Sequence, residues 1–121
     1  MKIFVSHSSS FDFENQIYIP LRNSEINKQH EISFPHENGK DVITKDIIKD
    51  SNLVVAEISF SSTGQGIELG WADVFNIPVV CIFKTGSKYS KSIGKLTENF
   101  IEYDDSPDMI EKLSKYINNG K

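Results

Sequence analysis

The chain has little cysteine, no long apolar run and no excess of positive charge, and each shortage excludes a class of protein. The single cysteine, Cys81, permits neither a disulfide framework nor a zinc site built from cysteines. No apolar run approaches the roughly 18–20 residues that a membrane-spanning helix needs, and the apolar stretch at the N-terminus is too short for a signal peptide. A formal charge of −4 argues against a general nucleic-acid binder, which normally shows a basic face. We therefore expect a cytoplasmic domain without membrane or nucleic-acid partners.

The 121 residues predict one domain, 1–121, in which apolar runs alternate with helix-like stretches. The apolar runs, which we interpret as strands, lie at residues 2–5, 31–34, 52–59, 78–83 and 100–103. Helical spacing occurs at residues 11–27, with a disturbance at Pro20, at 41–49 and 63–76, weakly at 88–96, and after Ser106, the expected N-cap of a last helix. This alternation predicts a parallel sheet covered on both faces, and five strands favour a flavodoxin-like α/β sandwich with strand order 2-1-3-4-5.

The predicted strand order also locates a ligand site. Ligands of such sheets bind at the carboxyl ends of the strands, where the order of the strands reverses. Here that point lies between the first and third strands, whose following loops are residues 6–10 and 60–66. Both loops are rich in hydroxyl side chains, so topology and composition indicate the same place.

The second of these loops opens a helix with a distinctive sequence, SFSSTGQGIELGWA at residues 59–72. Gly64 and Gly66 allow a ligand to approach the backbone closely, and the helix N-terminus presents free N–H groups. Ser62 and Gln65 fit a capping box. The alternative interpretation is that these glycines only serve the packing of the strand against the helix.

Glu68 is the chemically informative residue of this segment. It lies near the first turn, where the helix dipole favours the charged form of its carboxyl group. An ionised carboxylate that faces a ligand crevice can attack an anomeric carbon, the first step of retaining glycosyl transfer. The alternative is a surface acid that only complements the helix dipole.

Residues 52–72, NLVVAEISFSSTGQGIELGWA, resemble the signature of the nucleoside 2-deoxyribosyltransferase family and of its relatives, the deoxynucleoside 5′-monophosphate N-glycosidases. The resemblance implies that Glu68 is the nucleophile that takes the deoxyribosyl group. It implies that Ser62 holds the sugar or a 5′-phosphate, and that Ser90, or else Ser92, matches a serine that a neighbouring subunit adds to the phosphate site. A homodimer or higher homo-oligomer is implied in the same way.

We add four residues of the two loops as candidate substrate contacts: Ser6, Ser8, Gly64 and Gly66. The expected ligand is a nucleoside or nucleotide. No cofactor is expected. The chain lacks a Gly-Lys-Ser/Thr phosphate loop, so ATP hydrolysis is not expected, and no metal is expected, because His30, His36 and Glu37 do not have ligand-like spacing.

The sequence departs from the family pattern at two positions. The family usually carries an Asp eight residues ahead of the position of Asn52, where it assists proton transfer to the departing base, but this chain has Thr44 there. Asp41, one helical turn away, is our candidate acid, whereas Asp46 points elsewhere. A Tyr that often lies on the first strand corresponds to Ile3. Because protonation of a leaving base contributes ~10²–10⁴-fold, a module that only binds nucleotides stays open as an alternative.

A second resemblance concerns residues 3–9, IFVSHSS, which are similar to the first box of TIR domains. In those domains an acid often follows soon after, as Asp12 does here. TIR domains share this sheet architecture, and some cleave the nicotinamide–ribose bond of NAD with a helix Glu. A TIR-like domain that cleaves NAD or acts in signalling is therefore the second alternative, and it too involves an N-glycosidic bond.

Overall fold

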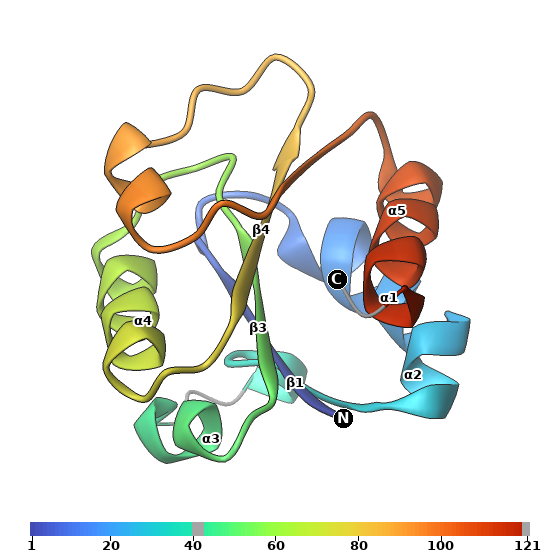
Figure 1. Ribbon diagram of the computed structural model, residues 1–121. Coiled ribbons are helices and arrows are strands. Elements are labelled where there is room, and N and C mark those ends of the chain that lie inside the picture. The colour runs from blue at the N-terminus through green and yellow to red at the C-terminus, as the bar shows by residue number, and fades with distance from the viewer. Residues whose placement is uncertain (40–42, 120–121) are drawn as a thin grey trace.

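A single parallel sheet organises the computed structural model, which describes residues 1–39 and 43–119 (Figure 1). Its five strands stand in the order β2-β1-β3-β4-β5. They are β1 (Lys2–His7), β2 (Glu31–Ser33), β3 (Leu53–Glu57), β4 (Val79–Lys84) and β5 (Phe100–Tyr103). All neighbouring pairs are parallel, so the predicted flavodoxin-like architecture and strand order are confirmed.

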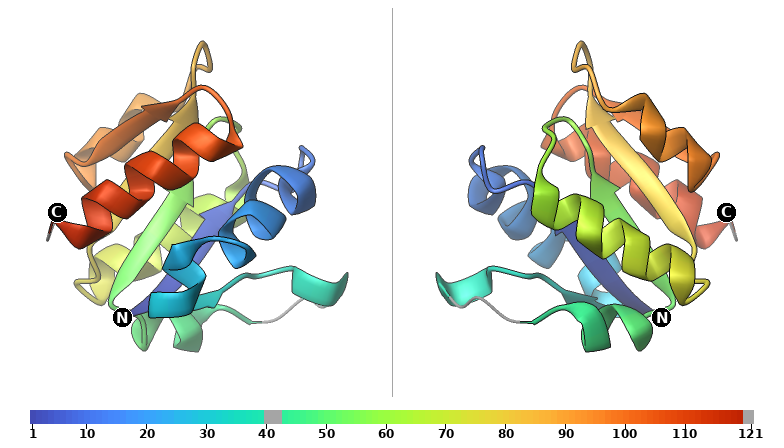
Figure 2. Two further views of the ribbon diagram at one scale, coloured as in Figure 1. Left: turned by 90° about the vertical axis from the view of Figure 1, so that its right-hand side faces the viewer. Right: turned by 90° about the vertical axis from the view of Figure 1, so that its left-hand side faces the viewer.

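Helices cover both faces of the sheet, as Figure 2 shows in its two opposite views. One face carries the π-helical turn η1 (Glu14–Tyr18), α1 (Ile19–Arg22), α2 (Glu25–Gln29) and α5 (Ser106–Asn118). The other face carries α3 (Lys45–Lys49), α4 (Thr63–Val74) and the 3₁₀ turn η3 (Lys91–Lys95). Alternate residues of each strand enter one of two apolar clusters: on β3, Val55 packs towards α5 and Val54 towards α4. Strands buried on both faces explain the uninterrupted apolar runs.

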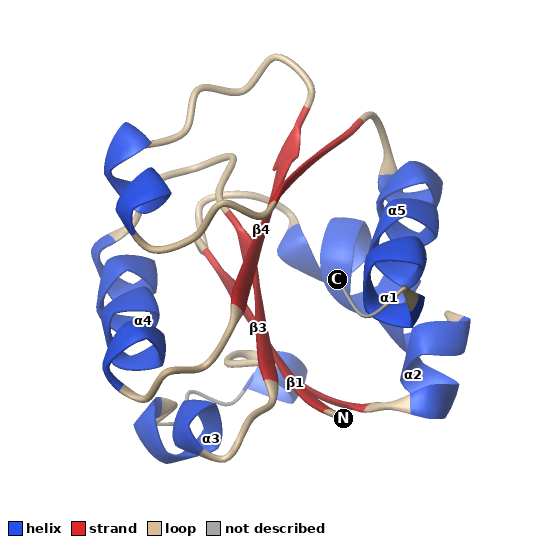
Figure 3. Cartoon of the chain, in the orientation of Figure 1, coloured by secondary structure: helices blue, strands red, loops and turns tan. Residues whose placement is uncertain are grey.

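The prediction of one continuous helix over residues 11–27 is wrong. The chain instead forms η1, α1 and α2 in succession (Figure 3). Pro20 is the second residue of α1, directly after the π-helical turn η1, so the helix changes its type at this proline. Asn23 then ends α1, and the extended backbone of Ser24 starts α2. These breaks keep Ile17, Tyr18, Leu21 and Ile26 in the core.

Two other helix starts differ from the prediction. Among the described residues the helix expected at 41–49 begins at Lys45. The last helix is capped by Asp105, whose side chain accepts the N–H of Asp108 at 2.9 Å, and not by Ser106. Ser106 is the first helical residue, and its hydroxyl donates to the carbonyl of Gln16 at 2.9 Å. An aspartate cap satisfies an exposed N–H as well as serine does, so spacing alone cannot choose between adjacent residues.

The loops that leave β1, β3 and β4 meet at one edge of the sheet (Figure 1). This edge is the carboxyl edge, where the predicted switch point between β1 and β3 falls. In the part of the chain that the structure describes, no helix is both long and apolar enough to cross a membrane.

Candidate active site

Glu68 lies on the second turn of α4, half-buried beside the carboxyl end of β1. Its Oε1 accepts a hydrogen bond from Ser6 Oγ at 2.8 Å, and its Oε2 accepts one from Thr44 Oγ1 at 2.9 Å. Two hydroxyl groups from separate segments therefore fix the carboxylate in orientation. Each carboxylate oxygen has a further lone pair, so these two hydrogen bonds leave the group able to act on a ligand.

Burial raises the pKa of Glu68, whereas the hydrogen bonds from Ser6 and Thr44 and the charge of His36 act in the opposite direction. That the helix dipole favours the charged form of Glu68 stays a prediction. No acidic residue stands in the first turn of α4, and desolvation is the largest influence on this carboxyl group. A carboxylate that exchanges water for fixed hydroxyl dipoles is poised for attack on a ligand.

An open pocket of about 260 Å³ adjoins the carboxylate. Its lining residues are Ile43, Thr44, Gly64, Ile67, Glu68 and Trp71. Trp71, which helical spacing places in the core, is only partly buried and forms one side of this pocket. Glu68 therefore faces a surface that a ligand can reach, and the interpretation as a surface acid that merely complements a dipole does not describe its contacts.

Only one of the two hydrogen bonds of the predicted capping box occurs at the start of α4. Ser62 Oγ accepts the N–H of Gln65 at 3.2 Å. Gln65 does not complete the box: its Nε2 donates to the carbonyl oxygens of Glu57 at 2.7 Å and Ser6 at 3.3 Å. This buried amide ties the ends of β1 and β3 to the helix, and it thereby holds Ser6 against Glu68.

Gly64 and Gly66 are both exposed, and a Cβ added at either would meet nothing within 4 Å. The interpretation that they serve strand–helix packing is therefore wrong. Without side chains they leave the first turn of α4 uncovered, where N–H groups such as those of Thr63 and Gly64 have no acceptor within the helix. This bare helix start can receive an anion or a sugar hydroxyl.

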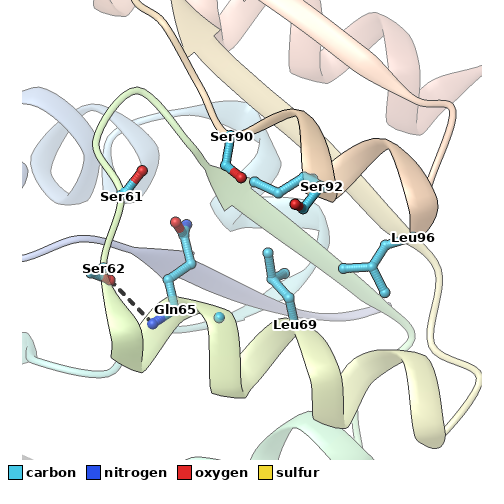
Figure 4. A pocket seen from close by; sticks show the side chains of 9 residues that line it. Ser61, Ser62, Gln65, Leu69, Ser90, Ser92 and Leu96 are labelled. Atoms are coloured by element: carbon cyan, nitrogen blue, oxygen red, sulfur yellow. Dashed lines mark hydrogen bonds between the residues drawn. The ribbon is translucent and has the colours of Figure 1, made fainter.

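A second pocket, of about 330 Å³, lies between α4 and η3 (Figure 4). It contains Ser62 and Gly66 together with Ser90 and Ser92 of the same chain. Glu68 is not among its lining residues. The predicted contacts thus divide over two sides of α4: Gly64 lines the pocket beside Glu68, whereas Ser62, Ser90 and Ser92 line the other pocket with Gly66.

Two further predicted residues differ in position from the expectation. Ser8 is buried, and its hydroxyl is 2.8 Å from that of Ser10, so it holds its own loop together. Asp41, the candidate acid, lies outside the described residues. Asp12, the acid of the TIR-like interpretation, is exposed and accepts a hydrogen bond from Asn15 Nδ2 at 2.9 Å.

His7 is buried at the end of β1 and belongs to a hydrogen-bonded chain. Its Nδ1 lies 2.8 Å from the carbonyl of Ser8, which can only accept, so Nδ1 carries the proton and Nε2 accepts from the hydroxyl of Tyr18. The same hydroxyl accepts the backbone N–H of His36 at 3.2 Å. Burial lowers the pKa of His7 and raises that of Tyr18, so both side chains are held neutral.

Aromatic rings lie beside this series of hydrogen bonds. The ring of His36 lies 5.7 Å from that of His7 and 5.9 Å from that of Phe13, while Phe13 and His7 are 4.5 Å apart. Planar groups near a nucleophile can stack on a nucleobase. Sequence reasoning missed Tyr18 and Phe13 because they lay inside a predicted continuous helix; the position of His36 at the end of β2 was the available signal.

A third cavity, of about 410 Å³, has the carboxyl group of Glu57 and the ring of Tyr103 in its lining. Glu57 is 1% exposed and accepts hydrogen bonds from the N–H of Ser59 at 2.8 Å, from Ser59 Oγ at 2.7 Å and from the hydroxyl of Tyr103. Sequence reasoning missed this network, because Glu57 ends an apolar strand. No metal-binding group of three or more His, Cys, Asp or Glu side chains occurs within residues 1–39 and 43–119.

Two solved structures share this fold over nearly the whole chain. A CMP N-glycosidase from Clostridium botulinum, BcmB, aligns with a TM-score of 0.69 and 21% identity, over 94% of this chain and 99% of that one. A 2-deoxyribosyltransferase from Leishmania mexicana aligns with a TM-score of 0.62 and 12% identity, over 97% of each chain. No protein-family model and no curated protein sequence matches the chain. The structural likeness confirms, at the level of the fold, the predicted resemblance to nucleoside 2-deoxyribosyltransferases.

Proposed function

We propose that this chain cleaves or transfers the glycosyl group at the N-glycosidic bond of a nucleoside or nucleoside 5′-monophosphate, with Glu68 as the nucleophile. The observation that carries the proposal is the Glu68 carboxylate, held by the hydroxyls of Ser6 and Thr44 at the switch point of the sheet and adjoining an open pocket. The full-length likeness to a CMP N-glycosidase and a 2-deoxyribosyltransferase supports the same chemistry.

In this mechanism one oxygen of Glu68 attacks C1′ of the sugar while the bond from C1′ to the base nitrogen breaks. The electron pair of that bond leaves with the base, which takes up a proton. The product of this step is a glycosyl ester of Glu68, and water or a second base then displaces the carboxylate at C1′. The hydroxyls of Ser6 and Thr44 keep the attacking group in one orientation throughout.

The remaining predicted residues bind the sugar end of the substrate in this proposal. Gly64 and the free N–H groups at the start of α4 receive the 5′-hydroxyl or 5′-phosphate beside Glu68. Ser62, Gly66 and Ser90 line the pocket on the other side of the helix start. Ser8 acts indirectly, by holding the loop that follows Ser6.

The test is release of the free base, measured by chromatography. The protein is incubated with CMP, dCMP, other nucleoside monophosphates, nucleosides and NAD, with and without a second free base. Base release or exchange that Glu68→Ala abolishes, while Glu111→Ala on the exposed side of α5 retains it, is the expected result. Both variants should melt near the unaltered protein.

Each other outcome favours a named alternative. Release that survives in Glu68→Ala would remove the nucleophile from the proposal. Release from NAD alone would favour the TIR-like interpretation. Calorimetric binding of a nucleotide without release from any substrate would make the chain a binding module.

A further inference from the structure

The proposed function assigns no residue to the base of the substrate. Gly64 is assigned to its 5′ end and Glu68 to C1′ of its sugar, and both residues line the open pocket of about 260 Å³. The rest of the lining consists of Ile43, Thr44, Ile67 and Trp71. Because the base leaves from C1′, it has to lie within reach of Glu68, and these four residues are what the pocket offers it.

This remaining part of the pocket is largely apolar. Ile43 is 84% exposed and Ile67 is 50% exposed, so both leave apolar surface uncovered beside a carboxylate. The hydroxyl of Thr44 already donates to Glu68 at 2.9 Å. Apolar surface is stabilised when a flat, weakly polar group covers it, whereas a phosphate would lose its hydration there. In a nucleoside or nucleotide, the flat group is the base.

Trp71 is the aromatic residue of this pocket. It follows Glu68 by three positions on α4, so the two side chains are neighbours on one face of the helix. A long side chain on a helix covers the turn that precedes its own Cα, and this direction brings the indole back towards Glu68. Trp71 also packs against the core cluster below α4 while remaining only partly buried. The core thus supports the ring, and part of the ring stays open to a ligand.

Three positions of α4 line the pocket in the order in which the parts of a nucleotide follow one another. Gly64, Glu68 and Trp71 are spaced by four and then three residues, which places them in one row along the helix. At a rise of about 1.5 Å per residue, this row is about 10 Å long. A substrate that lies along it has its 5′ end at the helix start, its sugar at the carboxylate and its base at the indole.

On the basis of the proposed function, we propose that the base of the substrate stacks on the indole ring of Trp71 while Glu68 displaces it. Trp71 takes no part in the bond changes; it holds the plane of the leaving group beside the carboxylate. Stacking on an aromatic ring tolerates every base, because every base has a flat face. Trp71 therefore selects an aromatic base as the leaving group without choosing between purines and pyrimidines.

The first experiment uses fluorescence, because Trp71 is the single tryptophan of the chain. The Glu68→Ala protein, which should not turn substrates over, is titrated with CMP, the other nucleoside monophosphates, the free bases and ribose 5-phosphate. Nucleotides and bases that bind should quench the fluorescence in a saturable manner, because a stacked base lies against the emitting ring. Ribose 5-phosphate, which has no base, should leave the fluorescence unchanged. Calorimetry on the same mixtures measures binding independently.

The second experiment measures the contribution of the ring in the active protein. In Trp71→Leu, which keeps an apolar contact with the core, KM for the best substrate should rise about 5- to 100-fold, whereas inhibition by ribose 5-phosphate should not change. Trp71→Phe should restore most of the affinity, because it keeps an aromatic face. Val74→Ser changes an exposed residue that follows on the same helix but is not among the lining residues, and it should not alter KM.

Four results would overturn the stacking contact. Calorimetric binding of a nucleotide without a change in fluorescence would place the base elsewhere. A loss of affinity in Phe13→Leu with none in Trp71→Leu would move the base to the ring of Phe13, which is not among the lining residues of this pocket. An equal loss for ribose 5-phosphate in Trp71→Leu would give Trp71 a merely structural role. Absence of both binding and base release would overturn the proposed function together with this contact, whereas base release that Glu68→Ala abolishes supports the proposed function by itself.

Discussion

Thr44 donates a hydrogen bond to Glu68 across 2.9 Å, from the position where the family resemblance places an acid for the leaving base. The residue at this position thus contacts the proposed nucleophile. Together with Ser6, which binds the other carboxylate oxygen at 2.8 Å, it supplies donors that offset the burial of Glu68. The proposed nucleophile and the two hydroxyls that orient it therefore come from one chain.

The first prediction concerns these two hydroxyls. They lower the pKa of Glu68, so their removal in Ser6→Ala or Thr44→Val should raise it further. Because the attacking form is the carboxylate, the rise of kcat/KM on the acid side of the pH profile should move to higher pH. Hydrogen bonds to charged groups contribute about 1.5–3 kcal/mol, so kcat/KM below that rise should fall roughly 10- to 100-fold.

Matched variants make this prediction specific. Thr44→Ser keeps the hydroxyl and should keep the pH profile, whereas Ser87→Ala removes a hydroxyl that bonds only to its own loop. An unchanged acid limb in both Ser6→Ala and Thr44→Val would show that these hydroxyls do not control the ionisation of Glu68.

The fold could be predicted because its strands are short and their cores are apolar runs. Runs such as LVVAE in β3 admit few alternatives once they alternate with amphipathic helices. The segment from Phe11 to Asn27 was harder, because its apolar spacing fits one helix while the chain breaks at Asn23 and Ser24. Periodicity reports which face is buried, but it does not report where a backbone turns.

The candidate site could likewise be predicted only in part. Glu68, Ser6 and Gly64 follow from strand order and loop composition, which are local or topological properties. The hydrogen bonds of Tyr18, His7 and His36 join three separate segments of the chain, so no local sequence pattern predicts them. The burial that raises the pKa of Glu68 depends on the packed structure, so it could not be predicted from the position of the residue on its helix.

The second prediction concerns the exposed glycines of α4. Alanine is a better helix former than glycine by about 1 kcal/mol in a helix interior, and a Cβ at Gly64, Gly66 or Gly70 would meet nothing within 4 Å. Gly66→Ala and Gly70→Ala should therefore raise the melting temperature, and Gly64→Ala, at the helix start, should do so less. If the helix start binds substrate, Gly64→Ala and Gly66→Ala should also raise KM several-fold.

Gly70→Ala is the internal control for that prediction, because Gly70 lies on the same helix but outside both pockets at its start. It should stabilise the protein without changing KM. Should all three variants gain stability and retain the original KM, the bare start of α4 would have no part in substrate binding.

The third prediction compares two tyrosines, one whose hydroxyl forms a hydrogen bond and one whose hydroxyl does not among the described residues. The hydroxyl of Tyr103 donates to the buried carboxyl group of Glu57, whereas the hydroxyl of Tyr116 is buried with no partner among the described residues. Tyr103→Phe should lower the free energy of unfolding by about 1–3 kcal/mol, because it leaves a buried acceptor short of a donor. Tyr116→Phe should be neutral or stabilising, because it removes a group that was desolvated without compensation. Urea unfolding of both variants measures the difference, and an unchanged free energy of unfolding in Tyr103→Phe would mean that Tyr103 stabilises the fold through its ring alone.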